Sequence, residues 1–145
     1  MCALAVWTAG VIVRASAPQT PDAPAPKPAS AGVYTAEQAA RGREVFGNIC
    51  QGCHNIGSQS GEAFAKRWRG VLLSDLFTLM TDTMPKDDPG SLTTKERIDV
   101  IAYLLKINDL AAGADELPAN IELLKRIVID LPEKEPTCDA RCLVQ

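Results

Sequence analysis

Apolar residues recur at spacings of three and four along the middle of the chain, and this period predicts amphipathic helices. Thr35 and Gln38 have the form of a capping box, which opens a helix over about 36–49. One face of this helix carries Ala39, Gly42, Val45 and Phe46. A second helix is expected to be capped by Ser74 and to end before Pro85, because the residue before a proline is disfavoured in helical conformation.

The same period continues in the second half of the chain. Thr93 and Glu96 form a further capping box, and the helix that follows is expected to end between Asn108 and Gly113. The positions of this helix that face a core are Ile98, Ile101, Ala102, Leu104 and Leu105. A short last helix is expected to begin at Pro118. The sequence shows no alternating strand series, glycine-rich phosphate loop or nucleophile elbow, so it predicts an all-α fold and gives little support to an α/β enzyme.

The N-terminal part of the chain has a different character. Residues 3–13 form an uncharged apolar run, shorter than the ~20 residues that span a bilayer. Residues 15–17 (Ala-Ser-Ala) resemble a cleavage signal, so 1–17 are expected to be a signal peptide, or part of an anchor that tethers the protein to a membrane through residues 3–13. Residues 18–32 are rich in Pro and Ala and are predicted to be an extended linker before a domain over 33–130.

Composition and charge narrow the class of protein. The chain has 145 residues, of which 46% are apolar and only 5% are aromatic, so a bulky apolar cofactor would help to build the core of its one domain. A formal net charge of −3 argues against nucleic acid as a partner, because phosphate binding needs a clustered basic surface. The chain has five Cys and one His, which excludes any site that needs two imidazoles.

The single His follows a pair of cysteines, in the sequence Cys50-Gln-Gly-Cys53-His54. Covalent attachment of haem needs two thiols that reach both vinyl groups of the porphyrin, and an imidazole directly after the second thiol to bind the iron. Cys50 and Cys53 are therefore the predicted attachment sites for one haem c, and His54 is a predicted axial ligand. A redox dithiol, or a zinc site completed by Cys138 and Cys142, is an alternative that the sequence context disfavours.

The other axial ligand cannot be a second His of this chain, and a methionine is the natural choice. Its thioether is soft and stabilises reduced iron, which suits an electron carrier. Met84 precedes Pro85 in a stretch whose prolines could hold a side chain across the haem face. Met80 lies on the apolar face of the preceding helix, where core packing is the simpler interpretation. Met84 is thus the predicted ligand, with Met80 and an open sixth position as alternatives.

The stretch 35–110 resembles a class I c-type cytochrome of the small bacterial monohaem type. In that family a glycine and an aromatic residue of the N-terminal helix cross an aromatic residue of the C-terminal helix, and Gly42, Phe46 and Tyr103 match these positions. The resemblance implies the cytochrome c fold, in which the N- and C-terminal helices cross around one covalently bound haem. A narrower similarity, over about 33–130, is to the cytochromes that accompany periplasmic dehydrogenases.

One position departs from the family pattern. Many members have a proline shortly after the haem motif, whose carbonyl accepts a hydrogen bond from the axial histidine and fixes its orientation. There is no proline between His54 and Pro85, so Ile56, Gly57 or a neighbouring carbonyl is expected to take that role, and the partner stays unassigned.

Two further sets of residues are candidates for lesser roles. The Trp68 indole could donate a hydrogen bond to a haem propionate, with Arg67 or Arg69 offsetting its charge, although a Trp beside a solvated basic turn is an equally plain interpretation. Cys138 and Cys142, in a C-terminal extension over 131–145, are spaced to form a disulfide in an oxidising compartment.

Together these features predict a periplasmic electron-transfer protein that is not an enzyme. It is expected to exchange single electrons by outer-sphere transfer, with a dehydrogenase as donor and an oxidase or another cytochrome as acceptor. The main alternative is the cytochrome subunit of a periplasmic dehydrogenase complex, and a structural zinc or dithiol module is a further one.

Overall fold

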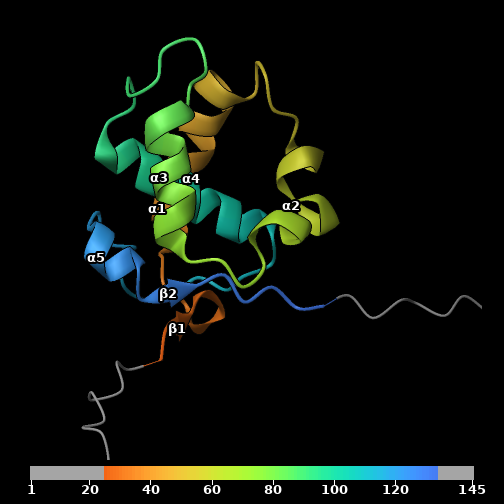
Figure 1. Ribbon diagram of the computed structural model, residues 1–145, viewed down its shortest axis with the longest axis vertical. Helices are drawn as coiled ribbons and strands as arrows, with labels where there is room; N and C mark the ends of the chain where they lie inside the picture. Colours follow the sequence, from red (N-terminus) through yellow and green to blue (C-terminus); the bar gives the residue numbers. More distant parts are fainter. Residues whose placement is uncertain (1–24, 134–145) are drawn as a thin grey trace, which may run out of the picture.

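The computed structural model describes residues 25–133, and in this part of the chain five α-helices enclose one core (Figure 1). Strand structure within the described residues amounts to two segments of two residues each. The predicted all-α class is therefore confirmed. The signal peptide or anchor predicted for 1–17 and the disulfide predicted for Cys138 and Cys142 lie outside the described residues.

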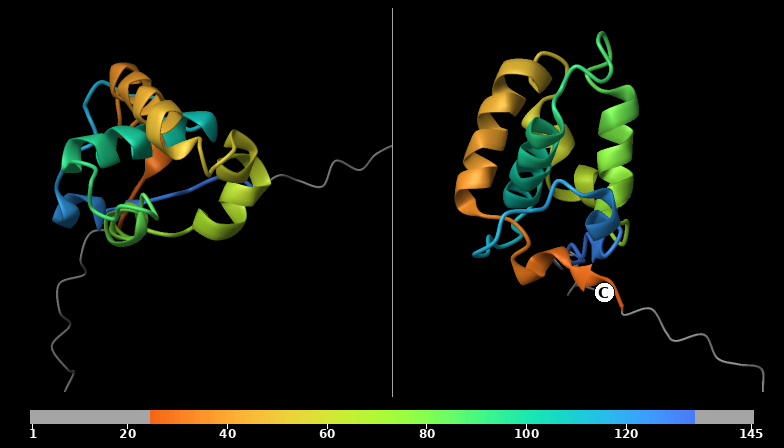
Figure 2. Two further views of the ribbon diagram at one scale, coloured as in Figure 1. Left: turned by 90° about the horizontal axis from the view of Figure 1, so that it is seen from above. Right: turned by 90° about the vertical axis from the view of Figure 1, so that its left-hand side faces the viewer.

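The centre of the fold is the crossing of α1 (Ala36–Val45) and α4 (Thr94–Ile107), as Figure 2 shows. A Cβ atom on Gly42 would lie 1.8 Å from the backbone oxygen of Asp99, so only glycine permits the two helices to approach this closely. Beside this contact the rings of Phe46 and Tyr103 pack with their centroids 5.4 Å apart and their planes at 53°. The helix crossing predicted from these residues is confirmed.

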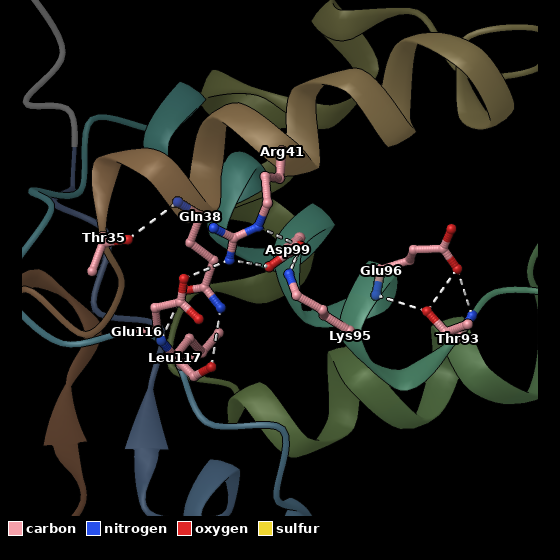
Figure 3. A network of polar contacts seen from close by, with 9 residues as sticks. All are labelled: Thr35, Gln38, Arg41, Thr93, Lys95, Glu96, Asp99, Glu116 and Leu117. Atoms are coloured by element: carbon pink, nitrogen blue, oxygen red, sulfur yellow. Dashed lines mark hydrogen bonds and ion pairs between the residues drawn. The ribbon is translucent and has the colours of Figure 1, made fainter.

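The two predicted capping boxes have different outcomes (Figure 3). At Thr93 the box is complete, because Thr93 Oγ1 accepts from the backbone N–H of Glu96 and the Glu96 carboxylate accepts from the N–H of Thr93. At Thr35 only half of it forms: Thr35 Oγ1 accepts from the N–H of Gln38 at 3.1 Å. The Gln38 side chain is buried and instead bonds both the N–H and the carbonyl of Leu117. Gln38 thus holds the segment after α4 against α1.

The third helix, α3 (Leu73–Thr83), ends at Met84 as Pro85 predicts. Its N-cap is Leu72 rather than the predicted Ser74, which lies buried inside the first turn of the helix. The neighbouring helix α2 (Gly61–Trp68) was not expected from the sequence.

The last helix, α5 (Ile121–Leu124), is shorter than predicted and begins after Asn120 rather than at Pro118. The side chain of Asn120 accepts hydrogen bonds from the N–H groups of Glu122 and Leu123, which satisfies donors that the start of a helix leaves free.

The folded body begins earlier than the predicted boundary at residue 33. Lys27–Pro28 (β1) pairs in parallel with Ile127–Val128 (β2), at one end of the helical body (Figure 1). Ala29 is fully buried, and the N–H of Ser30 donates to the Asp130 carboxylate at 2.9 Å. The small residues of the Pro/Ala-rich segment therefore pack against a strand about 100 residues away in the sequence. Within residues 25–133 no helix is both long and apolar enough to cross a membrane.

Candidate functional site

The predicted haem residues meet in one cavity of about 450 Å³. Cys50, Cys53 and His54 line it from the segment that follows α1, and Met84 lines it from the end of α3. Val100 and Leu104 of α4 also line it, so three elements that are far apart in the sequence border the cavity.

The way in which α1 ends determines the conformation of the segment that carries Cys50, Cys53 and His54. The π-helical segment η2 (Phe46–Cys50) continues α1, and the N–H groups of Cys53 and His54 both donate to the carbonyl of Cys50, at 3.1 and 2.9 Å. This tight turn brings both thiols and the imidazole to the same cavity. Both cysteines are free; Cys50 is half-buried and Cys53 is exposed. Burial raises the pKa of the Cys50 thiol, because the thiolate would lose solvation there.

The two methionines have different surroundings, although both line the cavity. Met80 is 7% exposed and belongs to the hydrophobic core, as its position on the apolar face of α3 predicts. Met84 is half-buried and is the C-cap of α3, where the backbone becomes extended. Met84 therefore presents its thioether from the point at which the chain leaves the helix.

The rest of the lining is largely apolar and suits a hydrophobic group. It includes Phe46, Phe64, Leu76, Val100 and Leu104. The cavity lies in the size range of sites that enclose small molecules and cofactors. Two thiols, an imidazole and a thioether are also the donors that bind and ligate a c-type haem. The cavity therefore fits haem in its volume, its apolar lining and the chemistry of its donor atoms.

The two arginines next to Trp68 have different surroundings in the structure. Trp68 is 8% exposed in the last turn of α2 and lines the cavity together with Arg67, whose guanidinium lies 5.1 Å from the centre of the indole ring. Arg69 does not line it: its guanidinium donates to the carbonyls of Leu131 and Pro132 instead. The backbone becomes extended at Arg69, where α2 ends, and this directs the side chain toward the C-terminal segment. Of the two arginines offered for a propionate, Arg67 therefore borders the cavity and Arg69 does not, while the propionate contact itself stays a prediction.

One residue of the site was not expected from the sequence. The side-chain amide of Gln59 lies 3.3 Å from Nδ1 of His54, and both residues line the cavity. The only signal for it in the sequence is an amide side chain five residues after the histidine, which is too common to single out.

The residues that line the cavity lie in the part of the chain that matches a protein family. The family described as "Cytochrome C oxidase, cbb3-type, subunit III" matches residues 37–104. No curated protein and no solved structure matches the chain. The matched range contains every residue that lines the cavity, and it ends before the segment that Gln38 holds against α1.

Proposed function

We propose that residues 37–104, the range that the family matches, form a c-type cytochrome domain with covalently bound haem c, and that the protein is a periplasmic monohaem electron carrier. The proposed haem residues are Cys50, Cys53, His54 and Met84. The observation that carries the proposal is their convergence, from two separate elements of the fold, on one apolar cavity.

Each of these residues has a distinct task in the proposal. The thiols of Cys50 and Cys53 hold the porphyrin covalently, so that the cofactor is not lost between partners. His54 and Met84 would hold the haem iron, which would supply a one-electron couple between Fe(III) and Fe(II). The thioether favours the reduced state, and the apolar walls keep water from the iron.

The edge of the cavity sets where electrons would enter and leave. Cys53 is exposed there, and the side chain of Ile49, another lining residue, is 42% exposed. A partner that covers this edge comes close to the porphyrin without reaching the iron, which is the geometry of outer-sphere transfer. We propose a dehydrogenase as donor and an oxidase or another cytochrome as acceptor. Arg67, Lys86 and Asp87 also line the cavity, so docking is expected to depend on ionic strength.

A second candidate is a haem subunit of a larger redox complex, either an oxidase or a periplasmic dehydrogenase. The description of the matched family favours it, since that description names an oxidase subunit. Purification of the full chain from its own membrane and soluble fractions separates the two. A free carrier is recovered alone, whereas a subunit is recovered in a fixed ratio with a larger enzyme.

The two methionines provide the test of the ligand assignment. We expect Met84→Ala to abolish the weak red absorption band of methionine-ligated ferric haem and to lower the reduction potential. The matched variant Met80→Ala is expected to keep the band and to lose about 2–5 kcal/mol of stability, because Met80 is a core residue. Loss of the band in both variants, or in Met80→Ala alone, would contradict the assignment.

A further inference from the structure

We propose that Gln59 is the positioning residue of the axial histidine, and that its side-chain amide lowers the reduction potential of the haem. This inference rests on the proposed function. It fills the position left open by the missing proline, with a side chain in place of a backbone carbonyl.

The geometry around the His54 ring carries the inference. The amide of Gln59 lies 3.3 Å from Nδ1 of His54, and within the described residues it is the one hydrogen-bond partner of that ring. Both side chains line the same cavity as Cys50 and Cys53. With Nδ1 engaged by Gln59, Nε2 is the ring nitrogen left for the iron.

The direction of this hydrogen bond follows from the chemistry of the ligand. A neutral imidazole that binds a metal through Nε2 carries its proton on Nδ1. The amide atom that faces Nδ1 in the structure is Nε2 of Gln59. A half-turn of the terminal amide exchanges its nitrogen and oxygen, and in that orientation the amide oxygen accepts the Nδ1 proton. Ser58 Oγ lies 3.2 Å from Nε2 of Gln59. After the half-turn the amide oxygen occupies that position, and the Ser58 hydroxyl can turn from the Asn55 carbonyl to donate to it.

The backbone of Gln59 is held in place by the buried side chain of the C-cap residue of α4. Asn108 is 7% exposed, and its amide donates to the carbonyl of Gln59 at 3.0 Å and to that of Leu104 at 2.8 Å. Its oxygen accepts from the N–H of Gly61 at 2.9 Å. The junction between η3 (Ile56–Gln59) and α2 is thereby fixed to the end of α4. Gln59 is thus presented to His54 from a rigid support, as a partner of a metal ligand needs to be.

The electronic consequence has a definite sign. An acceptor at Nδ1 draws the ring proton toward itself and makes the imidazole a stronger donor to the metal. A stronger donor stabilises Fe(III) relative to Fe(II), so the potential falls. Removal of the acceptor should raise the potential, and a carboxylate in its place should lower it further.

The experiment compares four variants of the full haem-loaded protein by redox titration. We expect Gln59→Leu to shift the potential upward and Gln59→Glu to shift it downward. Gln51 lies between the two cysteines, exposed, and makes no hydrogen bond to the His54 ring. Gln51→Leu is therefore expected to leave the potential unchanged, and Gln51→Glu to give only the smaller downward shift of a nearby charge. These matched controls separate the hydrogen bond from electrostatics and from side-chain size.

A second measurement reports the hydrogen bond itself. In proton NMR of the reduced protein, the Nδ1 proton of His54 should exchange with solvent faster in Gln59→Leu than in the wild type and in Gln59→Glu. The inference would be overturned if Gln59→Leu and Gln51→Leu had equal reduction potentials and the Nδ1 proton exchanged equally fast in Gln59→Leu and the wild type. If Gln59→Leu takes up no haem, the comparison of Gln59→Glu with Gln51→Glu decides. A larger downward shift of the reduction potential in Gln59→Glu supports the inference, and equal shifts overturn it. The wild-type spectrum tests the haem assignment separately.

Discussion

Replacement of Gly42 by alanine tests the helix crossing that supports the site. The new Cβ would lie 1.8 Å from the carbonyl oxygen of Asp99, whereas a close carbon–oxygen contact is about 3.3 Å. Helices α1 and α4 would therefore have to separate by roughly 1.5 Å. Separation also disturbs the contact of Phe46 with Tyr103 and the ion pair in which Arg41 lies 3.0 Å from Asp99 (Figure 3).

Overpacking of a well-packed core costs typically 1–3 kcal/mol, and here the clash is with backbone that no side-chain rotation relieves. We expect Gly42→Ala to lose about 3 kcal/mol, which corresponds to a fall of roughly 12 °C in the midpoint of thermal unfolding. Circular dichroism of the haem-loaded protein in the helical band measures this midpoint.

Gly47→Ala is the matched control for this substitution. Gly47 lies one turn further along, in η2, and a Cβ there would meet only the Gln51 side chain, at the ordinary distance of 3.8 Å. Alanine at this position is expected to be neutral, or stabilising by up to ~1 kcal/mol. Equal midpoints for the two variants would refute the argument that Gly42 is required by the helix crossing.

Two more predictions concern buried polar groups. Burial opposes ionisation of Asp99, but hydrogen bonds from Arg41 and Lys95 outweigh it and hold the Asp99 pKa below its usual value. Its contribution is therefore complete above about pH 4 and is lost as the pH falls through the lowered pKa, so Asp99→Asn should flatten the acid side of the stability profile in denaturant titrations. Asn108→Ala should cost about 2–3 kcal/mol and should speed proteolysis at the segment around Gln59, because the carbonyls of Gln59 and Leu104 both lose the donor that Asn108 supplies.

The sequence predicts those features that depend on local chemistry. Thr93 with Glu96 marks the start of α4, and Pro85 ends α3 at Met84, because capping and the constraint before proline act within a few residues. Gly42 indicates a close approach of two helices, since a glycine inside a helix is otherwise unfavourable. The haem motif likewise lies in five consecutive residues, so it can be recognised from the sequence without knowledge of the fold.

The features that the sequence does not predict depend on contacts between distant segments. The helix α2 has no side-chain cap and begins at Gly61, whose φ is +61°, so no local signal marks its start. The Arg69 side chain is directed by the carbonyls of Leu131 and Pro132, more than 60 residues away. Strand β1 likewise has its partner about 100 residues further along the chain. These pairings depend on tertiary structure.

The absorption spectrum of protein produced with export to the periplasm tests the central claim most directly. The account predicts an intense Soret band and, after reduction with dithionite, a narrow α-band, both of which remain with the polypeptide in denaturant. Cys50→Ser with Cys53→Ser removes both attachment sites, so any haem that this double variant retains should separate from the chain under the same conditions. A wild-type chain that shows no haem absorption, or that loses all of it in denaturant, would contradict the account.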